Sequence, residues 1–130
     1  MIEQDLRTYL LAQAPVSALI GTRIFPLRLP QGVTLPAVTY QRISGVPVIS
    51  HDGASDLARA RIQVDCWAAS YAAMAGLAMA IRTALSGYRG PMGNNGATAA
   101  RVINQIDLSE PEPALWRRMI DVAIWHREDS

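Results

Sequence analysis

Apolar residues recur with the period of an α-helix in two segments of the chain. The first segment covers residues 2–13, where acidic residues occupy the first turn and Pro15 follows the end. The second covers residues 70–86, with Ser70 in the N-cap position and Gly87 after the last periodic residue. The sequence therefore predicts two main helices, with a single short helical turn over residues 16–20 after the first.

The second helix has an unusual composition. Its core stripe is spaced by three or four residues and consists of Met74, Leu77, Ala78, Ile81 and Leu85. Most of its remaining face is alanine, and Arg82 is its only charge. This second face is either an ordinary surface of good helix formers or a smooth surface that another subunit can approach closely.

Alternation of apolar and polar residues, the pattern of a half-buried strand, marks much of the rest of the chain. It is clearest over residues 58–67, where Ala60, Ile62, Val64 and Cys66 alternate with Arg59, Arg61, Gln63 and Asp65. Further strands are predicted over residues 22–25, 37–44, 98–108 and 115–125. On the last of these, Ile120, Val122 and Ile124 point one way while Trp125 points the other.

Two segments between these elements predict loops. Residues 46–57 predict a long hairpin with a mobile tip, and the clearest turn residues of the chain lie there: His51, Asp52 and Gly53. Residues 87–96 contain four glycines and predict a flexible loop. That loop lacks the Lys-Ser/Thr ending and the preceding strand of a phosphate-binding loop, so we expect no nucleotide site. Its polar residues include Arg89, Asn94 and Asn95.

The predicted order of elements is helix, strand, strand, strand, helix, strand, strand. Helices spaced in this way can cover only one face of a largely antiparallel sheet. We therefore expect one α+β domain spanning residues 1–130, a two-layer sandwich of a mostly antiparallel sheet of four to five strands with two main helices packed on one face. The helices leave the opposite face of the sheet uncovered, so something other than a helix of this chain must account for that face.

Composition supports a folded protein and narrows its function. Half of the residues are hydrophobic and 18% are charged, which is a globular balance. The formal net charge of +1 argues against a dedicated nucleic-acid binder, because such proteins rely on a clustered basic surface. All 12 basic residues are arginine, which reflects either the codon usage of a GC-rich genome or the suitability of arginine for protein interfaces.

No set of residues indicates catalysis, a metal or a cofactor. His51 lies beside Asp52 in a turn, and no motif places a nucleophile near them. His126 is expected in a frayed tail, and the single cysteine, Cys66, is expected to be a buried thiol in a reducing compartment. The first residues lack the basic segment followed by an apolar segment that is typical of a signal peptide, and no segment is apolar enough to span a membrane. We therefore expect a non-enzymatic protein without membrane contact.

The polar sides of the strands are the candidate functional surfaces. Arg59, Arg61 and Gln63 share one side of a strand. Together with neighbouring Arg42 they are expected to face either another subunit or a lumen. Trp125 lies opposite the apolar residues of its strand, so it is either exposed or covered by a partner, and tryptophan is enriched at interface hot spots.

Several segments resemble the siphophage tail-completion, or tail-terminator, proteins in apolar spacing and in the placement of glycine and proline. They are residues 16–26 (Val-Ser-Ala-Leu-Ile-Gly-Thr-Arg-Ile-Phe-Pro), 35–44, 61–70 leading into the alanine-rich helix, and 118–125. The resemblance implies a subunit that assembles, typically as a hexamer, into a ring at the head-proximal end of the tail tube. Such rings stop tube polymerisation and dock onto the head connector. They leave a channel through which DNA passes without sequence-specific binding.

The resemblance also implies partners and a location. The partners would be further copies of this chain, the tail tube protein and the head-tail connector or adaptor protein, in the virion tail and in the host cytoplasm during assembly. The two predicted loops are candidates for axial contacts, through His51, Asp52, Gly53, Arg89, Asn94 and Asn95. A subunit of a prophage tail or of a gene transfer agent would have the same sequence features.

Two other interpretations stay open. The chain could be a different connector adaptor or a tail tube subunit, because ring subunits of this size share α+β construction. It could also be a small-molecule-binding α+β domain with the glycine-rich loop as a lid, which would require a pocket with convergent polar groups.

Overall fold

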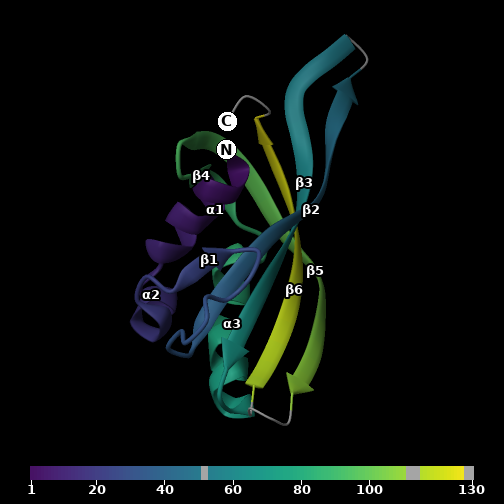
Figure 1. Ribbon diagram of the computed structural model, residues 1–130. Helices are drawn as coiled ribbons and strands as arrows, with labels where there is room; N and C mark the ends of the chain where they lie inside the picture. Colours follow the sequence, from purple (N-terminus) through teal and green to yellow (C-terminus); the bar gives the residue numbers. More distant parts are fainter. Residues whose placement is uncertain (51–52, 111–114, 128–130) are drawn as a thin grey trace.

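The computed structural model describes the backbone of residues 1–50, 53–110 and 115–127. Within these ranges the elements are α1 (Ile2–Leu11), α2 (Ala14–Ile20), β1 (Ile24–Pro26), β2 (Ala37–Ser50), β3 (Gly53–Ala68), α3 (Tyr71–Leu85), β4 (Arg89–Met92), β5 (Asn95–Glu110) and β6 (Leu115–Arg127). The helices all lie on one side of a curled sheet, and the ribbon of β2 and β3 projects beyond the other strands (Figure 1). The predicted α+β class is confirmed.

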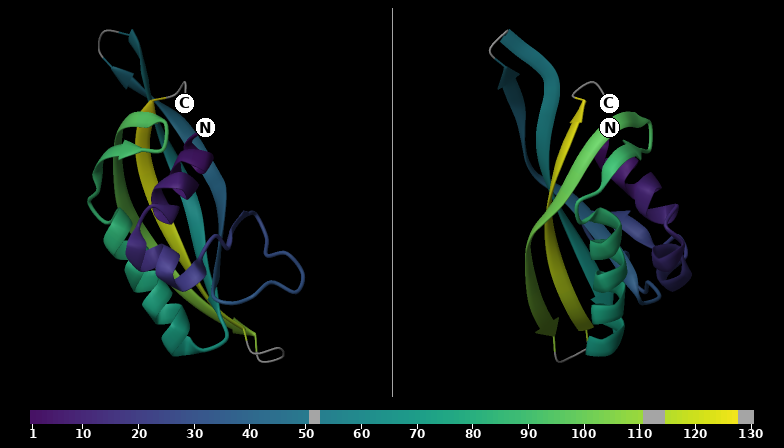
Figure 2. Two further views of the ribbon diagram at one scale, coloured as in Figure 1. Left: turned by 90° about the vertical axis from the view of Figure 1, so that its left-hand side faces the viewer. Right: turned by 180° about the vertical axis from the view of Figure 1, so that it is seen from behind.

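The sheet is larger and more curved than the sequence indicates. Among the described residues it has six strands in the order β1-β2-β3-β6-β5-β4. The short β1 runs parallel to β2, while the other neighbours are antiparallel. Views from the side and from behind show the sheet curling into a half-barrel with α1, α2 and α3 against one surface (Figure 2). The predicted, mostly antiparallel sheet with helices on one face is therefore confirmed in outline, but among the described residues it has six strands rather than four to five, three helices rather than two, and the curl of a half-barrel.

The helices follow from capping and from the apolar stripes. The Ser70 hydroxyl accepts a hydrogen bond from the Ala73 amide at 3.2 Å, which is the predicted N-cap of α3. The buried residues of α3 are the five of the predicted stripe. Pro15 does more than end α1, because proline fits the first turn of a helix, and here it lies in the first turn of α2, which extends the predicted short turn to Ala14–Ile20.

The glycine-rich segment is ordered into a strand and a tight turn. Residues of β4 pair with β5, and the Thr98 hydroxyl donates to the Gly90 carbonyl at 2.7 Å. Gly93 has a φ of +55°, and a Cβ at this position would lie 2.6 Å from the Cα of Asp5 in α1. The glycines therefore allow a turn and a close contact with α1, and the expected flexible loop is wrong.

The core lies between the sheet and the helices. Alternate residues of β3 and β6, including Ile62 and Ile120, are fully buried, as are Leu77 and Ile81 of α3. Cys66 is also fully buried, which confirms the prediction of a buried thiol. Burial raises the pKa of this thiol far above its ordinary value, because the interior disfavours the thiolate.

Candidate functional site

The side of the sheet that faces away from the helices, called the open face below, carries most of the candidate residues. Cross-strand pairing places Arg59 beside Trp125 and Gln63 beside Asp121. The intervening residues of β3 point into the core. Arg59, Arg61 and Gln63 therefore share the open face, in agreement with the alternation of the sequence.

Charged side chains on the open face are linked across strands. Arg61 of β3 forms an ion pair with Asp121 of β6. Further along the same face, Arg117 Nη2 of β6 donates to Asp65 Oδ2 of β3 at 3.0 Å. The side-chain amide of Gln63 also donates to the two carboxylate oxygens of Asp65, at 3.0 and 3.1 Å. These contacts hold Arg61 and Arg117 in place. The alternation of the sequence predicts which face a residue lies on, but it does not predict its partner on the next strand.

Asp65 is the most deeply buried acid of this network. Its side chain is only 5% exposed, and burial raises the pKa of its carboxyl because the interior disfavours the charged form. Arg117 and the hydrogen bond from Gln63 act in the opposite direction, since they favour the carboxylate. The Arg117 guanidinium also lies 4.7 Å from the centre of the Trp67 ring, and the Trp67 indole donates to the Thr39 hydroxyl at 2.9 Å.

Trp125 is neither bare nor part of the core. It is half-buried on the open face between Arg59 and Ala99, its cross-strand neighbours. It lines a groove of about 390 Å³ together with Arg89 and Arg101. Part of the ring therefore remains accessible beside arginines that come from two different strands.

Arg42 does not belong to the open face. It is paired with Ile62 across β2 and β3, so its side chain continues the row of Val38 and Tyr40 toward the helices. There it forms an ion pair with Glu3 of α1, Nε to Oε1, at 2.5 Å. The grouping of Arg42 with Arg59 and Arg61 is therefore corrected: at the end of the core row, α1 supplies the carboxylate that makes a charged residue acceptable.

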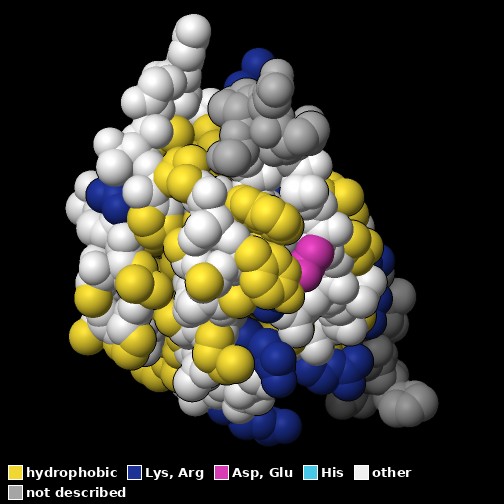
Figure 3. All heavy atoms as spheres, turned by 90° about the horizontal axis from the view of Figure 1, so that it is seen from below, with side chains coloured by type: hydrophobic (Ala, Val, Ile, Leu, Met, Phe, Trp, Pro, Cys, Tyr) yellow, Lys and Arg dark blue, Asp and Glu magenta, His cyan; other side chains and the backbone are white. Residues whose placement is uncertain are grey.

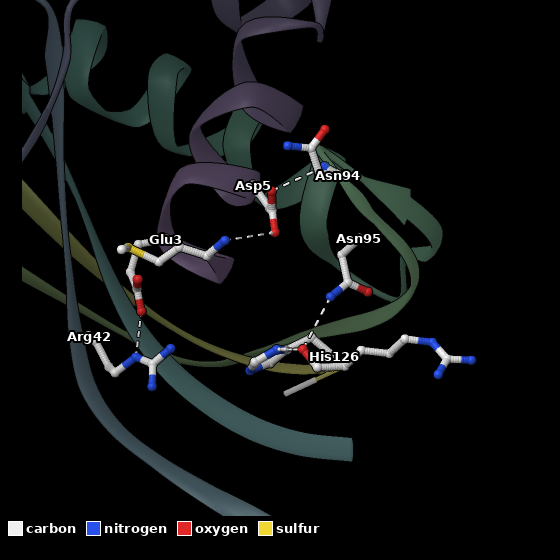
Figure 4. Close-up of polar contacts among 8 residues, drawn as sticks. Glu3, Asp5, Arg42, Asn94, Asn95 and His126 are labelled. Atoms are coloured by element: carbon white, nitrogen blue, oxygen red, sulfur yellow. Dashed lines mark hydrogen bonds and ion pairs between the residues drawn. The ribbon is translucent and has the colours of Figure 1, made fainter. Parts of the chain in front are cut away.

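The β4–β5 turn is anchored to α1 and to the end of β6 (Figure 4). The backbone N–H of Asn94 donates to Asp5 Oδ1 at 3.1 Å, and the Met1 ammonium lies 3.7 Å from Asp5 Oδ2. Asn95 is 2% exposed, and its side-chain amide donates to the Arg127 carbonyl at 3.3 Å. Of the predicted contact residues in this segment, Arg89 and Asn94 are exposed whereas Asn95 is buried.

His126 is also placed differently from expectation. It lies within β6, paired with Ala58, and is 3% exposed rather than part of a frayed tail. Its Nδ1 is 2.7 Å from the Arg127 carbonyl oxygen. The end of β6 is therefore part of the folded body, and only residues 128–130 lie outside the described chain there.

The arm formed by the ends of β2 and β3 extends beyond the sheet. Pairing of β3 with β6 ends at Leu57 and Arg127, while β2 and β3 continue together to the pair Ser50 and Gly53. Figure 1 shows this two-stranded arm standing clear of the helices and of β5. Gly53 begins β3, whereas His51 and Asp52 lie outside the described residues.

The second face of α3 is part of an apolar groove. The groove has a volume of about 820 Å³, and its lining comes from α1, α2, α3 and the turn before β4, including Tyr9, Leu19, Met79, Ala80 and Tyr88. None of its lining residues is charged. Seen from below, hydrophobic side chains gather where α2 and α3 lie, and acidic side chains are scarce (Figure 3). Of the alanines on this face of α3, Ala80 and Ala84 line the uncharged groove.

The described residues lack two other features. They contain no cluster of three or more His, Cys, Asp or Glu side chains that could hold a metal ion. No helix in the described part of the chain is long and apolar enough to cross a membrane.

Comparisons with known proteins give a family and a fold. A family model described as "Tail completion protein gp17" matches residues 4–127. A chain from a solved structure of the virion of a native gene transfer agent (GTA) particle is similar, with a TM-score of 0.73 and 18% sequence identity over 97% of this chain and 91% of that chain. At this identity the similarity shows a shared fold. No match was found among curated protein sequences.

Proposed function

The chain belongs to the tail completion protein gp17 family, and from this premise we propose that it forms a hexameric ring that ends the tail tube and joins it to the head connector. The family is structural rather than enzymatic. The ring would sit at the head-proximal end of the tail of a phage, a prophage particle or a gene transfer agent, after assembly in the host cytoplasm. Its partners are the tail tube protein and the connector or adaptor protein.

The observation that carries this proposal is the family match, which extends over nearly the whole described chain. The shape of the subunit supports it. A ring subunit needs two different lateral surfaces, surfaces above and below, and a surface toward the lumen. This chain offers an apolar helix groove, a projecting arm and a polar open face as separate surfaces.

The open face is the surface we assign to the lumen. Arginines outnumber carboxylates on it: Arg59, Arg61, Arg101 and Arg117 lie there with Asp65 and Asp121. A mildly basic wall keeps passing DNA hydrated and loosely attracted, since each phosphate contact adds to a salt-dependent affinity. Too strong a basic surface would hold the DNA, and the near-neutral charge of the chain avoids this.

The axial contacts are assigned to the arm and to the β4–β5 turn. His51, Asp52 and Gly53 would meet the connector or the tube from the end of the arm, and the exposed Arg89 and Asn94 would add contacts beside α1. Asn95 would position the turn from its buried site. Trp125, half-buried between arginines, would be covered when a neighbour docks.

The proposal is tested by the self-association of the protein and by its binding to tails. The purified protein is measured by light scattering over a concentration series, alone and with purified tails that lack their terminal ring. A hexamer, or stoichiometric binding at one end of the tails, is the expected result. A protein that stays monomeric and does not bind to such tails would refute the proposal.

Two variants refine this test. Deletion of residues 52–55 should leave folding intact and abolish tail joining, whereas fully infectious particles would reject the axial role of the arm. Trp125→Ala should weaken assembly of a folded subunit, with Trp125→Phe as the conservative control. Global unfolding of Trp125→Ala would show instead that this residue is part of the core.

A further inference from the structure

β5 has an open edge along most of its length. Among the described residues, β4 pairs only with the first part of β5, and the last bond on that side runs from the Ala100 amide to the Tyr88 carbonyl at 2.8 Å. Beyond it, residues 101–109 pair with β6 on one side and with no described strand on the other. This edge is about 30 Å long at the usual rise of a strand.

β2 has a second open edge at the other side of the sheet. β1 pairs with β2 only from Val38 to Tyr40, and the last bond there runs from the Leu27 amide to the Tyr40 carbonyl at 2.9 Å. From Gln41 onward no described strand covers this side of β2. Pro47 limits the edge to about six residues with a full set of backbone donors and acceptors, since proline has no N–H.

Proline is absent from residues 41–46 of the β2 edge and from residues 101–109 of the β5 edge, and each edge has one register shift, between Arg42 and Ser44 and between Val102 and Asn104. Natural proteins blunt exposed edges with charge, proline or very short strands. The outermost strands have these features, since β1 ends in Pro26 and β4 contains Pro91. In contrast, residues 101–109 have no proline and expose three large apolar side chains: Ile103, Ile106 and Leu108.

We propose that the β5 edge of one copy, residues 101–109, pairs with the β2 edge of a second copy, beginning at Gln41, so that the sheet continues from subunit to subunit. The two edges are different surfaces of one chain, so the contact is heterologous and can close into a ring. This inference rests on the proposed ring for its closure, but the pairing itself needs only a second copy of the chain.

The topology sets the direction of this pairing. β2 is antiparallel to β3, β3 to β6, and β6 to β5, so β5 runs opposite to β2 within one chain. Rotation about a ring axis that lies along the strands does not reverse a strand. The β5 edge therefore meets the β2 edge of the next copy in antiparallel orientation, which is the more favourable ladder.

Side chains at the two edges match in character. On the open face, Ile106 and Leu108 are 49% and 47% exposed at the β5 edge, and Ile43 is 45% exposed at the β2 edge. Ile43 and Ile106 both border a shallow hollow on the open face with Gln63 and Asp121. Joining two copies would bring Ile43 of one beside the β5 residues of the other, which adds apolar burial to the backbone hydrogen bonds.

The test combines edge charges with amide exchange. Ile106→Lys and Leu108→Lys place a charge on the edge without touching the core, and Thr8→Lys, at an exposed position of α1 outside both edges and outside the apolar groove, is the matched control. Both edge variants should stay folded and lose assembly, while the control should assemble. Hydrogen exchange of the wild-type protein should show that the amides facing the open edges, about every second residue of 41–46 and 101–109, are protected in the assembly and exchange freely in the monomer.

The outcomes separate this inference from the proposed function. Assembly without protection of these amides, or edge variants that assemble as the wild type does, would overturn edge pairing and leave the ring in place. Protected assemblies that do not bind tails would support edge pairing and overturn the tail role. A wild-type chain that associates neither with itself nor with tails would overturn both.

Discussion

Arg117→Met tests the buried charge network of the open face. Arg117 donates to Asp65 at 3.0 Å and lies 4.7 Å from the centre of the Trp67 ring. Methionine keeps an unbranched apolar side chain but removes the guanidinium, and with it the contact over the Trp67 ring. Asp65, with a side chain 5% exposed, would then be a buried carboxylate without its cation.

The cost follows from what remains around Asp65. Removing one partner of a buried ion pair typically destabilises a protein by about 3–5 kcal/mol. Arg117 is 29% exposed and Gln63 still donates to Asp65, so we expect a smaller loss, about 2–3 kcal/mol. With Asp65→Asn in the same chain no buried charge is left, so the double variant should recover about 1 kcal/mol or more.

The assay is urea unfolding of the wild type, both single variants and the double variant, at pH 7 and near pH 4.5. Burial raises the pKa of Asp65, so above its ordinary pKa the folded chain holds this proton more readily than the unfolded chain. The stabilisation from that proton is present at low pH and is lost as the pH rises through the folded pKa. Arg117 lowers the pKa of Asp65, so its removal raises this pKa further and makes stability depend more strongly on pH. The loss of stability caused by Arg117→Met should therefore be smaller at pH 4.5 than at pH 7. A deficit below about 1 kcal/mol, or one that neither Asp65→Asn nor pH changes, would refute this account of the network.

Two further predictions concern the packing of the body. Gly93→Ala should destabilise the chain by about 2 kcal/mol or more beyond Gly32→Ala in thermal unfolding, because both glycines have a positive φ but only at Gly93 would a Cβ meet the backbone of Asp5; equal losses would contradict the close contact. Cys66 should not react with an aromatic disulfide reagent in the native protein and should react fully in urea, because burial raises its pKa and blocks access; rapid native labelling would show that the sheet opens around it.

Elements with strong local signals were predicted well from the sequence. The stripe of α3 and its Ser70 cap define that helix almost to the residue, because capping and the core stripe act within one segment. The alternation on β3 likewise placed Arg59, Arg61 and Gln63 on one face. Arg42 was misplaced although it follows Val38 and Tyr40 in the same alternation, since its partner Glu3 is distant in sequence.

Elements that depend on distant partners were not predictable in this way. β4 leads into a turn in which Gly93 fits against Asp5, and nothing local distinguishes that use of glycine from flexibility. The open edges of β2 and β5 are a property of strand order, since their sequences would be equally compatible with covered strands. The candidate site was therefore predicted as a face but not as a face with two open edges.

Two arginines of the chain each donate to two acceptors at once. Arg118 bonds both oxygens of Asp107, from Nε at 2.6 Å and Nη2 at 3.1 Å, and this lowers the pKa of Asp107 through the hydrogen bonds. Arg23 donates to the Pro36 and Leu19 carbonyls at 2.9 and 3.1 Å. A lysine has a single nitrogen and cannot form either fork, so geometry requires arginine at these positions.

The open face sets a different requirement. Within the described residues, Arg59 and Arg101 form no ion pair and both are exposed, whereas Arg61 and Arg117 on the same face are paired with carboxylates. Their contribution to a lumen would be charge alone, which lysine supplies equally well. Arg59→Lys and Arg101→Lys should therefore preserve DNA passage, measured as infectivity or transfer, whereas Arg59→Glu with Arg101→Glu should reduce it. Equal performance of the lysine and glutamate variants would remove the open face from the lumen.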